Sequence, residues 1–130
     1  MATPQRLQAG QRLADDDALN TILATPMWQT NPSITALAGG ALSASTPVLT
    51  LGSNTLTSVA SGSDSVVVPK AVAGNVVFVA NAGGNDAKVY GNGSDTINGT
   101  AGATGVTLAN AKRALYVAAA NGVWFSILTA

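Results

Sequence analysis

The segment ALYVAAANGVWFSIL, residues 114–128, decides the fold more than any other part of the sequence. Two apolar runs flank Asn121-Gly122, a dipeptide typical of the two-residue type I′ turn that joins the strands of a β-hairpin. Cross-strand partners follow from such a turn by counting outward on both sides. The predicted pairs are Ala120 with Val123, Ala119 with Trp124, Ala118 with Phe125, Val117 with Ser126, and Tyr116 with Ile127.

In this register both faces of the hairpin are apolar. An antiparallel hairpin usually keeps one face in contact with water. Covering both faces requires either a position between two layers or a second subunit. We favour the subunit and predict a homo-oligomer, in which Trp124, Phe125 and Leu128 lie in the core or between subunits. One predicted face carries Tyr116, Ala118, Phe125 and Ile127, and the other carries Leu115, Val117, Ala119, Trp124 and Leu128.

Short runs rich in β-branched residues precede the hairpin from Val48 onward, separated by Gly, Asn, Ser and Asp. Runs of this length and spacing are typical of small all-β domains. We expect residues 48–130 to form an all-β domain, a small antiparallel β-sandwich or barrel. The runs are VLTLG, LTSVA, SVVVP, NVVFVAN, AKVYG and GVTLA.

Residues 1–47 differ from this domain and are expected to form an extended N-terminal arm. They hold four of the five prolines and little periodic sequence. Within them, DDDALNTILA supplies an aspartate cap and an acidic first turn, which predicts one short helix near residues 15–24. Its apolar residues Leu19, Ile22 and Leu23 need a surface to pack on. Trp28 follows in a turn-like frame and packs either on the core of the domain or on another protein.

Composition excludes several classes of function. The 130-residue chain balances six basic against six acidic residues, so no broad charge attracts nucleic acid or an anionic membrane surface. No segment reads as a secretory signal or is long enough for a membrane helix. Cys, His and Glu are absent, which removes zinc ligand sets and Ser-His-Asp catalysis. We therefore expect no enzyme, no cofactor and no metal site.

The glycine-rich segment YGNGSDTINGTAGATG, residues 90–105, is the remaining candidate for a ligand site. It lacks the lysine of a phosphate loop and the third glycine of the dinucleotide motif. GNGSDTI matches much of the calcium-binding nonapeptide repeat, but the following nine residues place Thr104 where the second aspartate belongs. We expect Asp95 to brace a turn and the glycines to thread the chain between strands.

Residues 66–128 resemble a small β module of tailed-bacteriophage virion proteins. The resemblance rests on a strand ending in Asn, a KVY strand, a GSDTING turn and a final hairpin with an aromatic pair, in this order. These correspond here to Val76 to Asn81, Lys88 to Tyr90, Ser94 to Gly99, and Ala114 to Leu128. The resemblance implies a β domain, often trimeric, displayed on or cementing a particle, and it carries over no catalytic residue.

The expected function is that of a phage virion structural protein, made in the host cytoplasm. The short arm favours a capsid decoration or cement protein that binds the assembled head through the major capsid protein and stabilises it. Leu19, Ile22, Leu23 and Trp28 would anchor the arm. The alternative is a head-fibre or tail-fibre module in which the loops at residues 83–86 and 91–105 bind a glycan of the host surface.

Overall fold

The computed structural model describes residues 28–130. Every regular element in this part of the chain is a β-strand, which confirms the expected all-β class. The helix expected near residues 15–24 lies outside the described residues. The strands are β1 (Gln29–Thr35), β2 (Gly52–Ser58), β3 (Ser65–Val67), β4 (Val76–Asn81), β5 (Ala87–Tyr90), β6 (Thr96–Ile97), β7 (Thr100–Ala101), β8 (Val106–Leu108), β9 (Arg113–Ala120) and β10 (Val123–Leu128).

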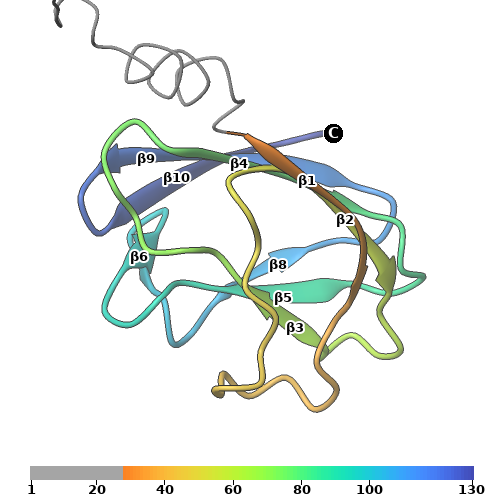
Figure 1. Cartoon of the computed structure of the whole chain (residues 1–130). Helices are drawn as coiled ribbons and strands as arrows, with labels where there is room; N and C mark the ends of the chain where they lie inside the picture. Colours follow the sequence, from red (N-terminus) through yellow and green to blue (C-terminus); the bar gives the residue numbers. More distant parts are fainter. Residues whose placement is uncertain (1–27) are drawn as a thin grey trace, which may run out of the picture.

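Two sheets form the two layers of the molecule (Figure 1). The larger sheet has seven strands in the order β1-β2-β4-β9-β10-β6-β7, and the smaller has three in the order β3-β5-β8. Buried side chains from both sheets and from the connections fill the space between the sheets. The largest include Leu49, Leu56, Ile97, Leu108, Tyr116 and Trp124.

The first half of the described chain winds as a short β-solenoid. β1, β2 and β4 are parallel neighbours in the large sheet, and β3 and β5 are parallel neighbours in the small sheet. The chain alternates between the sheets, from β2 to β3 to β4 to β5, so each parallel neighbour is reached through the opposite layer. The expected sandwich or barrel was to be antiparallel, and these parallel coils depart from that expectation.

Antiparallel strands close the last coil. β8 pairs with β5 in the small sheet, while β9 pairs with β4 and β10 with β9 in the large sheet. The strand runs are short in both halves, and periodicity does not reveal whether neighbours are parallel or antiparallel. A sequence with suitable strand spacing is therefore compatible with either arrangement.

The β domain begins before the expected boundary at Val48. β1 lies inside the segment 1–47 that was expected to be an arm, yet it pairs with β2 and its Ile34 is buried in the core. Proline content gave the wrong impression because Pro32 sits on an edge strand, where a missing N–H costs little ladder pairing.

The hairpin of β9 and β10 forms at the expected place but in a shifted register. Val123 pairs with Ala120 as predicted, but Trp124 lies opposite Ala118 rather than Ala119. Phe125 in turn lies opposite Val117. This slip of one residue moves every following side chain of β10 to the other face relative to β9. The two predicted faces are therefore wrong, and Trp124 shares the inner face with Ala118.

The conformation of the turn explains the slip. Gly122 has φ of 80°, whereas Asn121 is not among the described residues with positive φ. A type I′ turn needs positive φ at both central residues, while a glycine alone in this region is typical of a turn followed by a bulge. The type I′ pattern occurs instead at Asn98-Gly99, with φ of 52° and 79°, in the connection between β6 and β7.

Candidate interaction surface

The outer face of β4, β9 and β10 is apolar. Inner residues such as Val77, Tyr116 and Trp124 are fully buried, and the residues that alternate with them point away from the small sheet. Two of these outer residues are largely exposed, Phe125 at 52% and Ile127 at 68%. Monomeric soluble proteins rarely expose large contiguous patches of apolar side chains.

Strand register arranges the outer residues in two rows across the three strands, and we call them together the outer apolar face. One row joins Val76, Val117 and Phe125, and the other joins Phe78, Leu115 and Ile127. Leu128, at the end of β10, is 54% exposed but pairs with Ala114, so it alternates with these rows and does not belong to them.

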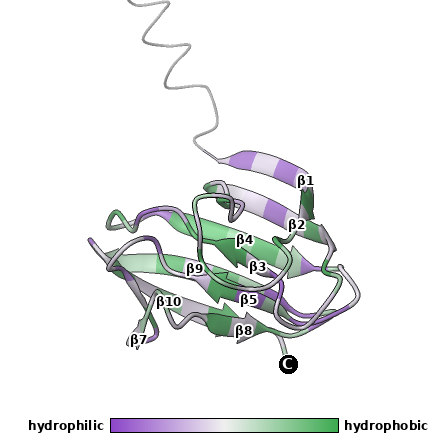
Figure 2. Ribbon diagram, turned by 90° about the horizontal axis from the view of Figure 1, so that it is seen from below, coloured by the Kyte–Doolittle hydropathy of each residue, from purple (hydrophilic) through white to green (hydrophobic). Residues whose placement is uncertain are grey.

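Polar residues border the outer apolar face on the β1 and β2 side. Phe78 pairs with Ser53 of β2, and Ser53 pairs with Thr30 of β1. On the next row, Ala80 lies between Thr55 and Arg113. Figure 2 shows the same change, with β4 largely green and β1 purple and white. The apolar region therefore ends at β2 beside Phe78 and Ala80.

Tyr116 lies on the inner side of β9, beneath the outer apolar face, and is uncharged. Its ring is fully buried, and its hydroxyl has no hydrogen-bond partner among the described residues. Burial raises the pKa of Tyr116, because an ionised phenol would lose its hydration in the core. The side chain therefore stays neutral over the ordinary pH range.

Edge pairing is a poor way for the large sheet to bind a partner through β1. Its exposed strand edge carries Pro32, and its register with β2 is irregular between Asn31 and Thr35. Prolines and bulges of this kind block the addition of another strand. The outer apolar face is thus the stronger candidate for binding, and covering Phe125 or Ile127 would contribute on the order of 1 kcal/mol per side chain.

The predicted site residues fall into separate groups. Trp124 belongs to the core, where its Nε1 donates a hydrogen bond to the Pro69 carbonyl at 3.2 Å. Phe125 and Leu128 are exposed, and Trp28, directly before β1, is 57% exposed. Leu19, Ile22 and Leu23 lie outside the described residues. Sequence analysis missed Val76 and Phe78 as partners of the hairpin, although the unbroken apolar run VVFVA marked a strand with two apolar sides.

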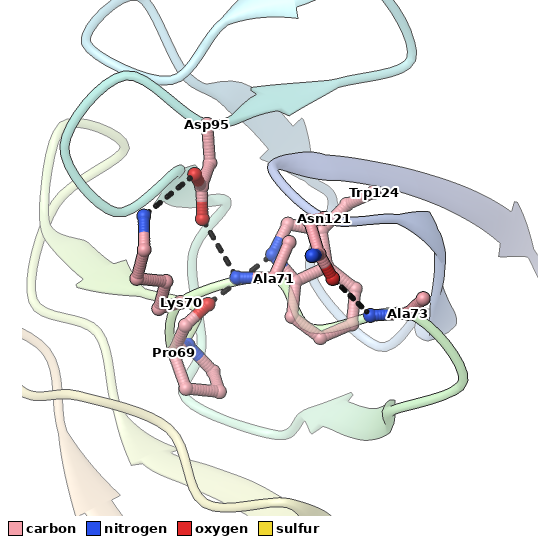
Figure 3. A network of polar contacts seen from close by, with 7 residues as sticks. All are labelled: Pro69, Lys70, Ala71, Ala73, Asp95, Asn121 and Trp124. Atoms are coloured by element: carbon pink, nitrogen blue, oxygen red, sulfur yellow. Dashed lines mark hydrogen bonds and ion pairs between the residues drawn. The ribbon is translucent and has the colours of Figure 1, made fainter.

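Asp95 braces a loop, as Figure 3 shows. Its buried carboxylate accepts a hydrogen bond from the Ala71 N–H at 2.7 Å and lies 3.5 Å from the Lys70 ammonium. The Asn121 side chain accepts a hydrogen bond from the Ala73 N–H at 3.0 Å, so the hairpin turn is bonded to the same loop. The Asp95 carboxylate therefore joins its own loop to the loop after β3, and its contacts are with the Lys70 ammonium and the Ala71 N–H.

The glycines of residues 90–105 allow close passage of two backbone segments. A Cβ on Gly102 would lie 2.4 Å from the Asp95 carbonyl oxygen and 2.7 Å from Gly91 Cα, so no side chain fits there. Gly91 and Gly102 also share a backbone hydrogen bond. This segment is packed against itself and leaves no room for a ligand between its strands.

Other kinds of site are not found in the part of the chain that the structure describes. Residues 28–130 contain no pocket and no group of three residues suited to hold a metal ion. The same residues include no helix with the length and hydropathy needed to span a bilayer. The outer apolar face is the candidate site that the geometry supports.

Comparison of the chain with family models, with curated proteins and with solved structures found no match.

Proposed function

We propose that this chain is a structural protein of a phage virion, a decoration or cement protein that attaches to the assembled head. The observation that carries the proposal is the outer apolar face, whose Phe125 and Ile127 are exposed on β10 of the large sheet. A flat apolar surface without a pocket suits protein contact better than small-molecule chemistry. No enzyme activity and no cofactor are part of the proposal.

In this proposal, the arm and the outer apolar face contact different partners. The arm residues Leu19, Ile22 and Leu23, with Trp28, anchor on the major capsid protein, and the outer apolar face contacts neighbouring copies, as a trimer on the particle. Because binding is restricted to the assembled shell, its free energy adds to the stability of the shell by mass action. Many copies multiply a small increment through avidity.

The fibre alternative has weaker support from the geometry. A glycan site in the loops at residues 83–86 and 91–105 would use an aromatic ring as a platform for sugar. Tyr90, the aromatic residue at these loops, is 8% exposed, and its hydroxyl donates a hydrogen bond to the Gly40 carbonyl. Its ring is therefore engaged in the fold.

Electron microscopy of purified virions, with gold-labelled antibody against residues 48–130, tests the location. We expect label scattered over the head. Label at the tail tip would favour the fibre alternative, and particles without label would contradict a virion protein.

Full-length variants test the arm. Leu19→Asp, Ile22→Asp and Leu23→Asp together should abolish co-sedimentation with assembled shells, because charge prevents apolar packing. The control adds the same charge on the opposite side of the expected helix, with Asn20→Asp, Thr21→Asp and Ala24→Asp. Equal attachment of both variants would contradict the role of the arm.

A further inference from the structure

The outer apolar face and the apolar residues of the arm both need cover when no particle is present. We propose that, in the free protein, residues 15–24 of the same chain lie on the outer apolar face and cover it. The cover itself is independent of the proposed function, whereas its release on a particle rests on that function.

The position where the described chain begins allows this contact. Gln29, the first residue of β1, pairs with Gly52, and Gly52 pairs with Val77. Val77 pairs with Tyr116, which pairs with Ser126. The chain therefore enters the sheet in line with the middle of the outer apolar face, level with the gap between its two rows.

The distances are short enough for residues 15–24 to lie across the strands. Strands in a sheet are about 4.8 Å apart, so β4 lies about 10 Å and β9 about 14 Å from β1. The six residues from Leu23 to Gln29 span up to about 20 Å when extended. Leu23 can thus reach β4 or β9, and Leu19, one helical turn or about 6 Å further on, can reach β10.

The chemistry of the two surfaces also agrees. Leu19, Ile22 and Leu23 offer an apolar stripe at helical spacing, and the outer apolar face offers six apolar residues without a charge among them. A helix that covers one face of a sheet is a common way to complete a layered domain. The polar strip formed by Thr30 and Ser53 would lie under the connection, where main-chain groups need polar neighbours.

A tethered segment has an advantage over a second molecule. The connection to β1 holds residues 15–24 at an effective concentration in the millimolar range, far above that of free copies in a dilute solution. A second copy would have to displace this cover first. Attachment to the particle would do so by offering the arm and the face each a new partner, and copies would then join on the shell rather than before it.

Engineered cysteines test the contact directly, because the chain has none of its own. The test variant carries Leu23→Cys with Leu115→Cys in the middle of the outer apolar face. The matched control carries Leu23→Cys with Thr107→Cys. Thr107 is exposed on β8 of the small sheet, opposite Lys88 of β5. We expect a disulfide within one chain to form at least about tenfold faster in the test variant, given the local concentration.

Each outcome decides the inference. Equal rates in the two variants, or a bridge that joins two chains, would overturn it. A second measurement avoids the cysteines: Leu19→Asp, Ile22→Asp and Leu23→Asp together should increase binding of an apolar fluorescent dye several-fold, and Asn20→Asp, Thr21→Asp and Ala24→Asp should not. Unchanged dye binding in the first variant would also overturn the cover.

Attachment of the bridged variant separates this inference from the proposed function. The oxidised Leu23→Cys, Leu115→Cys protein should fail to co-sediment with assembled shells, and the wild type should bind. If the intramolecular bridge forms but the wild type does not bind, the cover stands and the decoration function fails.

Discussion

Trp124 and Phe125 are adjacent aromatic residues of β10 with opposite surroundings. Trp124 is fully buried between the sheets, and Phe125 is 52% exposed on the outer side. The difference arises from strand geometry, because successive side chains point to opposite faces of a sheet. The inner face of the large sheet packs in the core, while Phe125 and Ile127 are exposed on the outer face of the same sheet.

Removing Trp124 gives the largest expected effect on stability. Trp124→Ala should lower the free energy of unfolding by roughly 3 to 5 kcal/mol, because it leaves a cavity between the sheets and removes the bond to the Pro69 carbonyl. Phe125→Ala is the matched control and should cost less than about 1 kcal/mol. Urea unfolding at equilibrium measures both, and equal losses would contradict the division between the faces.

Asn54 shows that the inner face also depends on polar contacts. Its side chain is buried, accepts from the Thr50 N–H at 2.9 Å, and donates to the Thr50 carbonyl at 2.9 Å and the Phe78 carbonyl at 3.1 Å. Asn54→Ala should cost roughly 2 to 3 kcal/mol, because these groups lose their partner away from water.

Thr55→Ala, on the outer side of the same strand, provides the comparison for Asn54→Ala. We expect a change within about 0.5 kcal/mol in thermal or urea unfolding. A cost at Thr55 as large as that at Asn54 would show that the outer polar strip also stabilises the fold.

The sequence predicted the strands well and their pairing poorly. The runs NVVFVAN and AKVYG, like the final hairpin, became β4, β5, β9 and β10 because β-branched and aromatic residues bounded by Gly and Asn favour strands. Parallel coils were missed because the partner of β2 is reached only after the chain has passed through the other sheet. Local patterns carry no information about such distant pairing.

The candidate site was predicted in part for the same reason. Phe125 and Leu128, predicted as partner residues, are exposed, but Trp124 was placed on one face with Val117 and Ala119 of β9. The register shift between Val123 and Trp124 instead places Trp124 opposite Ala118 on the inner face. The choice between a type I′ turn and a bulged turn at an Asn-Gly step depends on tertiary contacts, here the bonds that Asn121 and Gly122 make with residues 71–73.

Tyr116 also lies on the inner face, but replacing it with Phe should increase the free energy of unfolding, by less than the losses expected for Trp124→Ala and Asn54→Ala. Tyr116→Phe should raise the free energy of unfolding by about 1 kcal/mol, because it removes a buried hydroxyl without a partner. The raised pKa of Tyr116 adds a pH dependence. Above about pH 10 the unfolded chain loses the phenol proton and the folded chain keeps it, so stability falls as pH rises.

Urea unfolding at pH 7 and pH 10.5 checks this prediction. The wild type should lose stability between the two values, and Tyr116→Phe should lose less, since its side chain does not ionise. A variant that is less stable at pH 7 would show that the hydroxyl has a bonded partner in solution.

Phe125→Lys gives the smallest expected effect on the fold and the sharpest test of the outer face. Because the Phe125 side chain is half exposed and points away from the core, a lysine there can extend into water, and the stability should change by less than about 1 kcal/mol. Attachment to assembled shells should nevertheless be lost, because contact would bury an unpaired charge. Thr55→Lys places the same charge on the polar strip of the same sheet and should keep attachment. If Phe125→Lys attaches as well as Thr55→Lys while both remain folded, the exposed rows of β4, β9 and β10 are not a binding surface, and the contrast between Trp124 and Phe125 reflects packing alone.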